Sequence, residues 1–117
     1  MSGSTSVYRT AGPTVGLSVV ATSHAAVSLA LTTNDSANYC AVVNTGAVAV
    51  AVKLSQAGLA AVLPGDGTQG DFILPAAMTQ PMILPMPWSP TAPAQITAIG
   101  AAAGPSLIYA TPVVIQS

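Results

Sequence analysis

The sequence predicts an all-β domain, a β-sandwich or jelly roll of about seven to eight short antiparallel strands. Short apolar runs rich in Val, Ile and Leu recur about every 8–12 residues, with clusters of Gly, Pro, Asn, Asp and Ser between them. Several runs alternate with a period of two, which is the period of a strand, and no sustained helical period is present. A chain of 117 residues fits one domain and can bury about two-thirds of its unfolded surface, so it can fold without disulfides.

The central stretch, residues 38–54, carries the clearest strand signal. It consists of two apolar runs joined by Asn44, Thr45 and Gly46. In the second run Val or Leu occupies every other position, and Ala or Lys occupies the positions between. This pattern predicts a central β-hairpin, in which Gly46 closes the turn in the left-handed conformation.

Further strands are predicted on both sides of this hairpin. They cover residues 14–22, 25–31, 71–75, 94–99 and 106–111. Prolines bound residues 82–84, which can therefore form only an edge strand, because proline cannot donate to a central ladder. Pro112 is expected to end the strand before it, and residues 113–115 are expected to form a last edge strand. Residues 59–63 fit either a helix or a strand.

The N-terminal residues differ in composition from the rest of the chain. Residues 1–13 are rich in Ser, Gly and Thr and are predicted to form a flexible N-terminal arm, ahead of a single sandwich domain over residues 14–117. Two interpretations of this arm are open. It is either a frayed terminus or a segment that becomes ordered on a neighbouring subunit, with Tyr8 and Arg9 as its contacts.

Charged residues are unusually few. They make up 4% of the chain, against about 25% in an ordinary soluble domain. They are Arg9, Asp35, Lys53, Asp66 and Asp71. One Lys and one Arg cannot form a basic patch, so no nucleic-acid partner is expected. Because charge depletion is typical of the buried centres of protein interfaces, we expect copies of the chain or a partner to cover much of the surface.

The apolar composition does not indicate a membrane protein. Hydrophobic residues make up 51% of the chain. Pro, Gly, Asn or Ser nevertheless interrupts every apolar run before about 18 residues, the length that a spanning helix needs. The N-terminal residues lack the apolar core of a signal peptide. We therefore expect no membrane association, and synthesis in the cytoplasm.

Few residues are candidates for chemistry. His24 is the only histidine and Cys40 the only cysteine, and a surface residue and a buried thiol are their ordinary interpretations. A zinc site would need more ligands, and a nucleophilic triad would need a second base. Asp66 and Asp71 flank a Gly-rich loop, which either is simply solvated or binds Ca²⁺ together with backbone oxygens. We predict no catalytic residue, no cofactor, no metal ion and no enzymatic activity.

Trp88, the only tryptophan, lies in the proline-rich segment PMPWSP. It belongs either to the core or to an interface, where tryptophan often contributes strongly to binding. Met78, Met82 and Met86 lie close by in the sequence and can form an adaptable apolar surface with it. The residues predicted to contact a partner are Tyr8, Arg9, Met82, Met86 and Trp88.

Three stretches, NYCAVVNTGAVAVAVKL, DFILPAAMTQPMILP and QITAIGAAAGPSLIYATP, together resemble small proteins from the structural modules of tailed bacteriophages. The resemblance covers roughly residues 38–113. Such proteins are often small β-sandwich head proteins that decorate or cement the capsid shell as dimers or trimers. The resemblance supplies no catalytic residues.

The residues and this resemblance together predict a structural virion protein that decorates or cements a bacteriophage capsid through uncharged, apolar subunit contacts. The expected partners are the major capsid protein and further copies of the chain, in a dimer or trimer. The expected location is the capsid surface, after synthesis in the host cytoplasm. The alternative is a small carbohydrate- or receptor-binding module of a phage fibre or tail. An exposed aromatic side chain beside Asp66 or Asp71 would favour this alternative.

Overall fold

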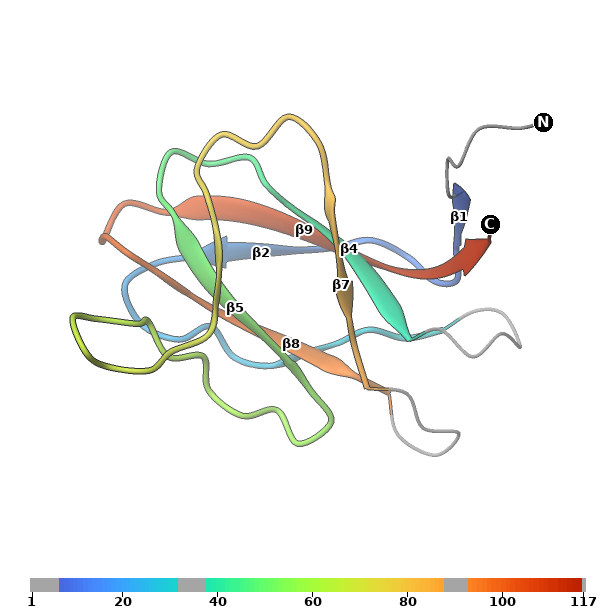
Figure 1. Ribbon diagram of the computed structural model, residues 1–117, viewed down its shortest axis with the longest axis horizontal. Helices are drawn as coiled ribbons and strands as arrows, with labels where there is room; N and C mark the ends of the chain where they lie inside the picture. Colours follow the sequence, from blue (N-terminus) through green and yellow to red (C-terminus); the bar gives the residue numbers. More distant parts are fainter. Residues whose placement is uncertain (1–6, 32–37, 88–92, 117) are drawn as a thin grey trace.

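The protein consists of two β-sheets packed as a sandwich (Figure 1). The computed structural model describes residues 7–31, 38–87 and 93–116, and these residues contain nine strands and no helix. The strands are β1 (Val7–Thr10), β2 (Val15–Val19), β3 (Val27–Ser28), β4 (Tyr39–Asn44), β5 (Val50–Ser55), β6 (Phe72–Leu74), β7 (Met82–Pro85), β8 (Gln95–Gly100) and β9 (Ser106–Gln116). The predicted all-β sandwich is confirmed.

The strand order is that of a jelly roll. Sheet A has the order β1-β9-β4-β7, with β2 also paired to β9, and sheet B has the order β3-β8-β5-β6. All pairs are antiparallel. Four of them follow one another along the chain: β2 with β9, β3 with β8, β4 with β7, and β5 with β6. The chain from β2 to β9 is thus one long antiparallel hairpin that is rolled up, so its two limbs contribute to both sheets.

The core lies between the sheets and is built from alternate residues of each strand. On β9, for example, Ile108 and Ala110 are buried, whereas Leu107 and Tyr109 are exposed. The core cluster includes Leu17, Val19, Cys40, Val42, Ile108 and Ala110 from sheet A, and Val50, Val52, Leu74, Ile96 and Ala98 from sheet B. Each fully buried Leu, Ile or Val side chain contributes about 1.5–3 kcal/mol relative to an exposed one.

The prediction of a central hairpin is wrong. β4 lies in sheet A and β5 in sheet B, so the chain between them crosses from one sheet to the other. Gly46 does not adopt the left-handed conformation. Among the described residues only Gly58, Gly67 and Ala77 have positive φ.

The crossing is held by the side chain of Asn44, which is fully buried. Its Nδ2 donates to the carbonyl oxygens of Val48 (2.8 Å) and Pro75 (3.2 Å). Its Oδ1 accepts from the N–H of Gly46 (3.1 Å) and from Ser106 Oγ (2.8 Å). Gly46 also lies directly against β9, where a Cβ would be 2.6 Å from Ser106 Cα. Glycine is therefore required here for close approach and not for its backbone conformation.

β9 continues through Pro112, which corrects the predicted end of the strand at this residue. The carbonyl of Pro112 accepts a hydrogen bond from the N–H of Ala11 (2.8 Å). Because the N–H and C=O of one strand residue point to the same side, the missing N–H of Pro112 also faces Ala11. At this point the chain passes from β1 to β2. The pairing of β1 with β9 ends at Val113, and the pairing of β2 with β9 ends at Ala110. Proline fits in this central strand because it lies where the pairing on that side is interrupted.

Val7–Thr10 lies inside the segment expected to be a flexible arm, but it forms β1 and pairs with the C-terminal end of β9. Ala11, which follows it, is buried. This part of the predicted arm therefore belongs to sheet A. Residues 1–6 lie outside the described residues.

Other predicted elements are found with changed lengths. β7 is an edge strand, as expected from its prolines. The strand predicted at residues 25–31 is reduced to β3, and residues 59–63 form neither a helix nor a strand. Among the residues that the structure describes, no helix is long and apolar enough to cross a membrane.

Candidate functional site

The outer surface of sheet A is apolar and uncharged. We call this surface the sheet A face; it consists of Gly16, Ser18, Ala41, Val43, Ile83, Leu107, Tyr109 and Thr111. Leu107 is 40% exposed and Tyr109 is 37% exposed. Gly16 leaves room for the ring of Tyr109, since a Cβ at position 16 would lie 3.4 Å from its Cε1. The ring therefore packs against Gly16 of β2 and contributes apolar surface to the face.

A hollow of about 320 Å³ opens on the sheet A face. It is lined by Thr10, Thr14, Ala41, Val43, Pro81, Tyr109 and Thr111. The hydroxyl groups of Thr14 and Thr111 lie 2.6 Å apart and form a hydrogen bond with each other. The lining thus offers hydroxyl groups and apolar surface, but no charged group.

The charged side chains within the described ranges lie away from the sheet A face. Lys53 Nζ and Asp71 Oδ1 form an ion pair at 3.1 Å beside sheet B, and Asp66 lies in the loop between β5 and β6. Arg9 pairs with Val114, which packs against the core, so Arg9 lies on the other side of β1 from the sheet A face. A partner can therefore cover the sheet A face without removing a charge from water.

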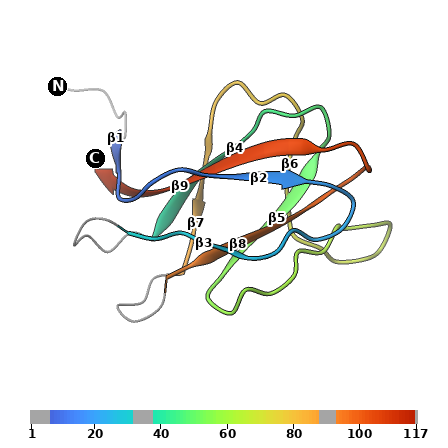
Figure 2. The ribbon, with the colours of Figure 1, turned by 180° about the vertical axis from the view of Figure 1, so that it is seen from behind.

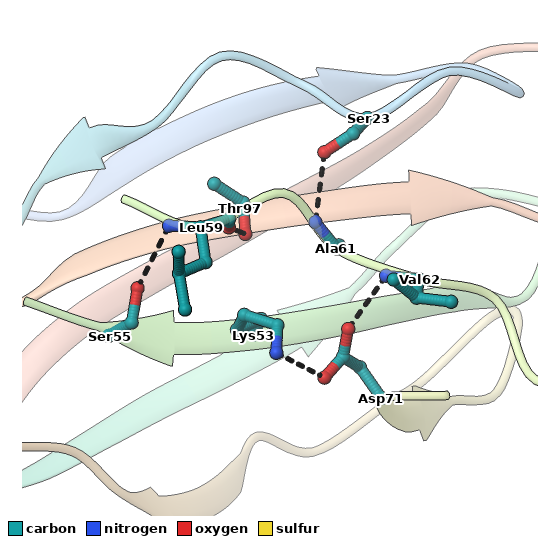
Figure 3. A network of polar contacts seen from close by, with 8 residues as sticks. All are labelled: Ser23, Lys53, Ser55, Leu59, Ala61, Val62, Asp71 and Thr97. Carbon is teal, nitrogen blue, oxygen red and sulfur yellow. Dashed lines mark hydrogen bonds and ion pairs between the residues drawn. The ribbon is translucent and has the colours of Figure 1, made fainter. Parts of the chain in front are cut away.

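The outer surface of sheet B is different, because the β5–β6 loop covers part of it (Figure 3). Thr97, on β8, is only 2% exposed, and its hydroxyl donates to the carbonyl of Leu59 at 2.7 Å. Asp71 Oδ2 accepts from the N–H of Val62 at 2.7 Å. Ser55 Oγ accepts from the N–H of Leu59 at 3.2 Å. Within the described ranges, the chain thus covers part of sheet B with its own loop, whereas Leu107 and Tyr109 of the sheet A face are exposed.

A cleft of about 380 Å³ lies at the side of the sandwich where β6 and β7 are the edge strands. It is lined by Val52, Lys53, Leu54, Asp71, Phe72, Leu84 and Pro85. Phe72 is 50% exposed and lies next to the ion pair of Asp71 with Lys53. An exposed aromatic ring beside a carboxylate is the feature that the carbohydrate-binding alternative requires.

Comparisons of this chain with protein-family models, with curated proteins and with solved structures found no match. The sheet A face and the cleft beside Phe72 are therefore the features on which a functional proposal depends.

The structure does not bring the predicted interface residues together. Tyr8 and Arg9 belong to β1 and Met82 to β7, with β9 and β4 between these strands in sheet A. Met86 is only 6% exposed and packs in the core, so it has little surface left for a partner. Trp88 lies outside the described residues.

The residues considered for chemistry lie in separate parts of the described structure. Cys40 is buried in the core, and burial raises the pKa of its thiol to about 12, which keeps it protonated at neutral pH. His24 precedes β3, and its Nδ1 lies 2.7 Å from the carbonyl oxygen of Ala25. Within the described ranges, no three His, Cys, Asp or Glu side chains form a group that could hold a metal ion.

The sheet A face was missed by sequence reasoning, although the sequence contains a signal for it. Along residues 106–111, apolar side chains occupy both sides of the strand, with Leu107 and Tyr109 opposite in direction to Ile108. A strand that is apolar on both sides is either covered on both faces or leaves an apolar face exposed. Sequence alone does not decide between these cases, because it does not show which loops cover which sheet.

Proposed function

We propose that this chain is a structural virion protein that decorates or cements a bacteriophage capsid, with the sheet A face lying against the shell. The observation that carries this proposal is the apolar and uncharged character of the sheet A face. A capsid offers the same protein surface many times, so many copies can dock in the same way. Apolar contacts gain free energy from burial and depend little on salt. The resemblance of residues 38–113 to small phage head proteins supports the same function.

The size of the sheet A face fits weak contacts that are repeated many times. Strands lie about 4.8 Å apart and rise about 3.4 Å per residue, so four strands of five or six residues cover roughly 350 Å². A standard interface buries about 800 Å² per partner. One copy alone would therefore bind weakly, and association between copies would strengthen attachment through multivalency.

Binding to capsids that lack the protein tests this function. Capsids of the virus that encodes the chain are incubated with the purified protein, pelleted and washed at low and at high salt. Mass spectrometry then measures the ratio of this chain to the major capsid protein. We expect saturable binding at a fixed ratio that survives the high-salt wash. Absence of binding, or its loss at high salt, would contradict the proposal.

Leu107→Asp and Leu59→Asp form a matched pair of variants for this assay. Leu107 lies on the sheet A face and Leu59 on the loop over sheet B, and both are exposed, at 40% and 56%. Neither change is therefore expected to unfold the protein. A charge at position 107 must lose its water on docking, so we expect capsid binding to fall by at least about tenfold for this variant. Binding by Leu59→Asp should be unchanged, and equal binding of the two variants would place the contact elsewhere.

The cleft beside Phe72 favours a second candidate function, the binding of a carbohydrate or receptor by a module of a phage fibre or tail. Sugar rings pack on aromatic faces, and charged groups such as those of Asp71 and Lys53 form strong hydrogen bonds with hydroxyl groups. Titration with a panel of oligosaccharides, followed by NMR, tests it. This function predicts shifts at Phe72, binding that is lost in Phe72→Ala and binding that is retained in Phe72→Tyr. A spectrum unchanged by every sugar would exclude carbohydrate binding at this cleft.

A further inference from the structure

β1 and the end of β9 form a two-stranded ribbon that extends beyond the rest of the sandwich (Figure 2). The pairing of β4 with β9 ends at Tyr39 and Val113, and the pairing of β2 with β9 ends at Val15 and Ala110. Within the described ranges, residues 114–116 therefore pair with β1 alone. Two strands by themselves are only marginally stable in water, so this ribbon would be stabilised by a third strand.

The direction of the backbone groups on β1 follows from one hydrogen bond. The N–H of Ala11 donates to the carbonyl of Pro112, so position 11 faces β9. Because backbone groups alternate in direction along a strand, Arg9 and Val7 also face β9. Tyr8 and Thr10 then direct their N–H and C=O groups away from β9, toward the edge of sheet A, where no further strand lies among the described residues. This edge offers donors and acceptors in the spacing that another strand requires.

We infer that the free edge of β1 pairs with β1 of a second copy of this chain, in an antiparallel arrangement about a twofold axis. An antiparallel strand edge is complementary to itself, which is what a twofold interface requires. The contact would join the A sheets of two copies into one continuous sheet through backbone hydrogen bonds. This inference rests on the self-association included in the proposed function and adds the surface that carries it.

β1 is better suited to this pairing than the edge strands β7 and β3. On β7 the edge is bounded by Pro81 and Pro85, which block strand addition because they lack the N–H donor. β3 is only two residues long. β1 contains no proline, and Ala11, which follows it, is buried in the core cluster.

The single charge on β1 selects the register of this pairing. If Tyr8 paired with Thr10 of the second copy, Arg9 would lie directly opposite Arg9 of that copy, and like charges directly opposite each other destabilise a sheet. If Tyr8 pairs with Tyr8 of the second copy, the two Arg9 residues are offset and Arg9 lies opposite Val7 of that copy. We therefore expect the second register.

Two variants at one position test the edge by multi-angle light scattering. Thr10→Pro removes the outward N–H without removing a bond to β9. A proline also restricts the residue before it to an extended backbone, which Arg9 already has in β1. Thr10→Val keeps the N–H and serves as the matched control. We expect the wild type and Thr10→Val to have the mass of a dimer, and Thr10→Pro to have a lower mass at the same concentration. If Thr10→Pro keeps the wild-type mass, the β1 pairing is wrong and self-association through another surface remains.

A monomeric wild type at every concentration would overturn both the β1 pairing and the self-association in the proposed function. A cysteine variant tests the register even if Thr10→Pro fails to fold. Directly paired residues have Cα atoms about 5.5 Å apart, within the range of a disulfide. Tyr8→Cys should therefore form a covalent dimer on mild oxidation, whereas Thr10→Cys should not, and the buried Cys40 thiol does not compete. Equal cross-linking of the two variants would overturn the proposed register.

Discussion

At the scale of single residues, Asn44 is central to the crossing between the two sheets. Its buried amide binds the carbonyl of Val48 and the hydroxyl of Ser106, among other groups. Asn44→Ala removes the hydrogen bonds to the N–H of Gly46 and to the carbonyl of Pro75. It leaves Val48 and Ser106 bonded only to each other, at 3.0 Å. We therefore expect the free energy of unfolding in urea to fall by roughly 2–4 kcal/mol. The neighbouring Thr45→Ala removes one exposed hydrogen bond and should cost less than about 1 kcal/mol. Equal losses for the two variants would argue against the role of Asn44.

Gly46 allows a test of why glycine occupies this crossing. A left-handed turn would accept Asn more readily than Ala. The closeness of Ser106 excludes both, since any Cβ at position 46 overlaps the backbone of β9. We expect Gly46→Ala and Gly46→Asn each to lower the free energy of unfolding by about 1–3 kcal/mol. Gly104→Ala, where a Cβ meets nothing within 4 Å, is the control and should be neutral within about 0.5 kcal/mol. A clear advantage of Asn over Ala would contradict the steric explanation.

Cys40 makes the stability depend on alkaline pH. Burial raises its pKa from an ordinary value of 9.0 to about 12 in the folded protein. Below pH 9 the thiol is protonated in both states, and its contribution to stability is fully present. As the pH rises from 9 toward 12, only the unfolded chain releases the proton, so the free energy of unfolding falls. Urea titrations across this range should show a steeper fall for the wild type than for Cys40→Ala. Parallel curves would mean that the thiol is not buried.

At the scale of elements, Thr97 connects the β5–β6 loop to sheet B. Thr97→Val keeps the shape of the side chain but leaves the carbonyl of Leu59 without its hydrogen bond. We expect a loss of roughly 1–2 kcal/mol and faster hydrogen exchange at the amides of residues 59–62. Thr97→Ser keeps the hydroxyl and should preserve the protection of these amides. Exchange that is unchanged in Thr97→Val would show that the loop is held by its other contacts.

The strands themselves could be predicted from the sequence, but part of their pairing could not. Alternation identifies β4, β5, β8 and β9 because it depends only on neighbouring residues. The turn at residues 44–46 has the residues of a hairpin, but a crossing between sheets can use the same residues. Whether a hairpin or a crossing forms depends on contacts with Ser106, which is distant in the sequence. The prediction that the strand ends at Pro112 is wrong for the same reason, since the position of Pro112 opposite the gap between β1 and β2 is set by tertiary structure.

The candidate site was harder to predict than the fold. Tyr8 and Arg9 were identified from a short apolar and charged pair in a polar segment, and they lie on the edge strand β1. Met86 was chosen for its neighbours in the sequence, but it points into the core. Leu107 and Tyr109 could not be predicted in this way, because their exposure depends on which described loops cover which sheet, and no local pattern shows this.

At the scale of the whole molecule, the few described charges and the jelly-roll topology separate the surface into distinct parts. The ion pair of Lys53 with Asp71 helps to hold the loop over sheet B, the sheet A face carries no charge, and β1 offers a free edge. Little charge repulsion keeps copies apart. These features are those on which the proposed assembly depends, namely backbone pairing between copies and apolar contact with a partner.

The mass of the purified protein in solution tests the central claim, that copies of this charge-poor chain associate with one another. Light scattering is measured over a range of concentrations at about 0.1 M and about 1 M salt, where the Debye length falls from about 10 Å to about 3 Å. The predicted result is a dimer or trimer with the same mass at both salt concentrations. A monomer at every concentration, or an oligomer that dissociates at high salt, would contradict the claim.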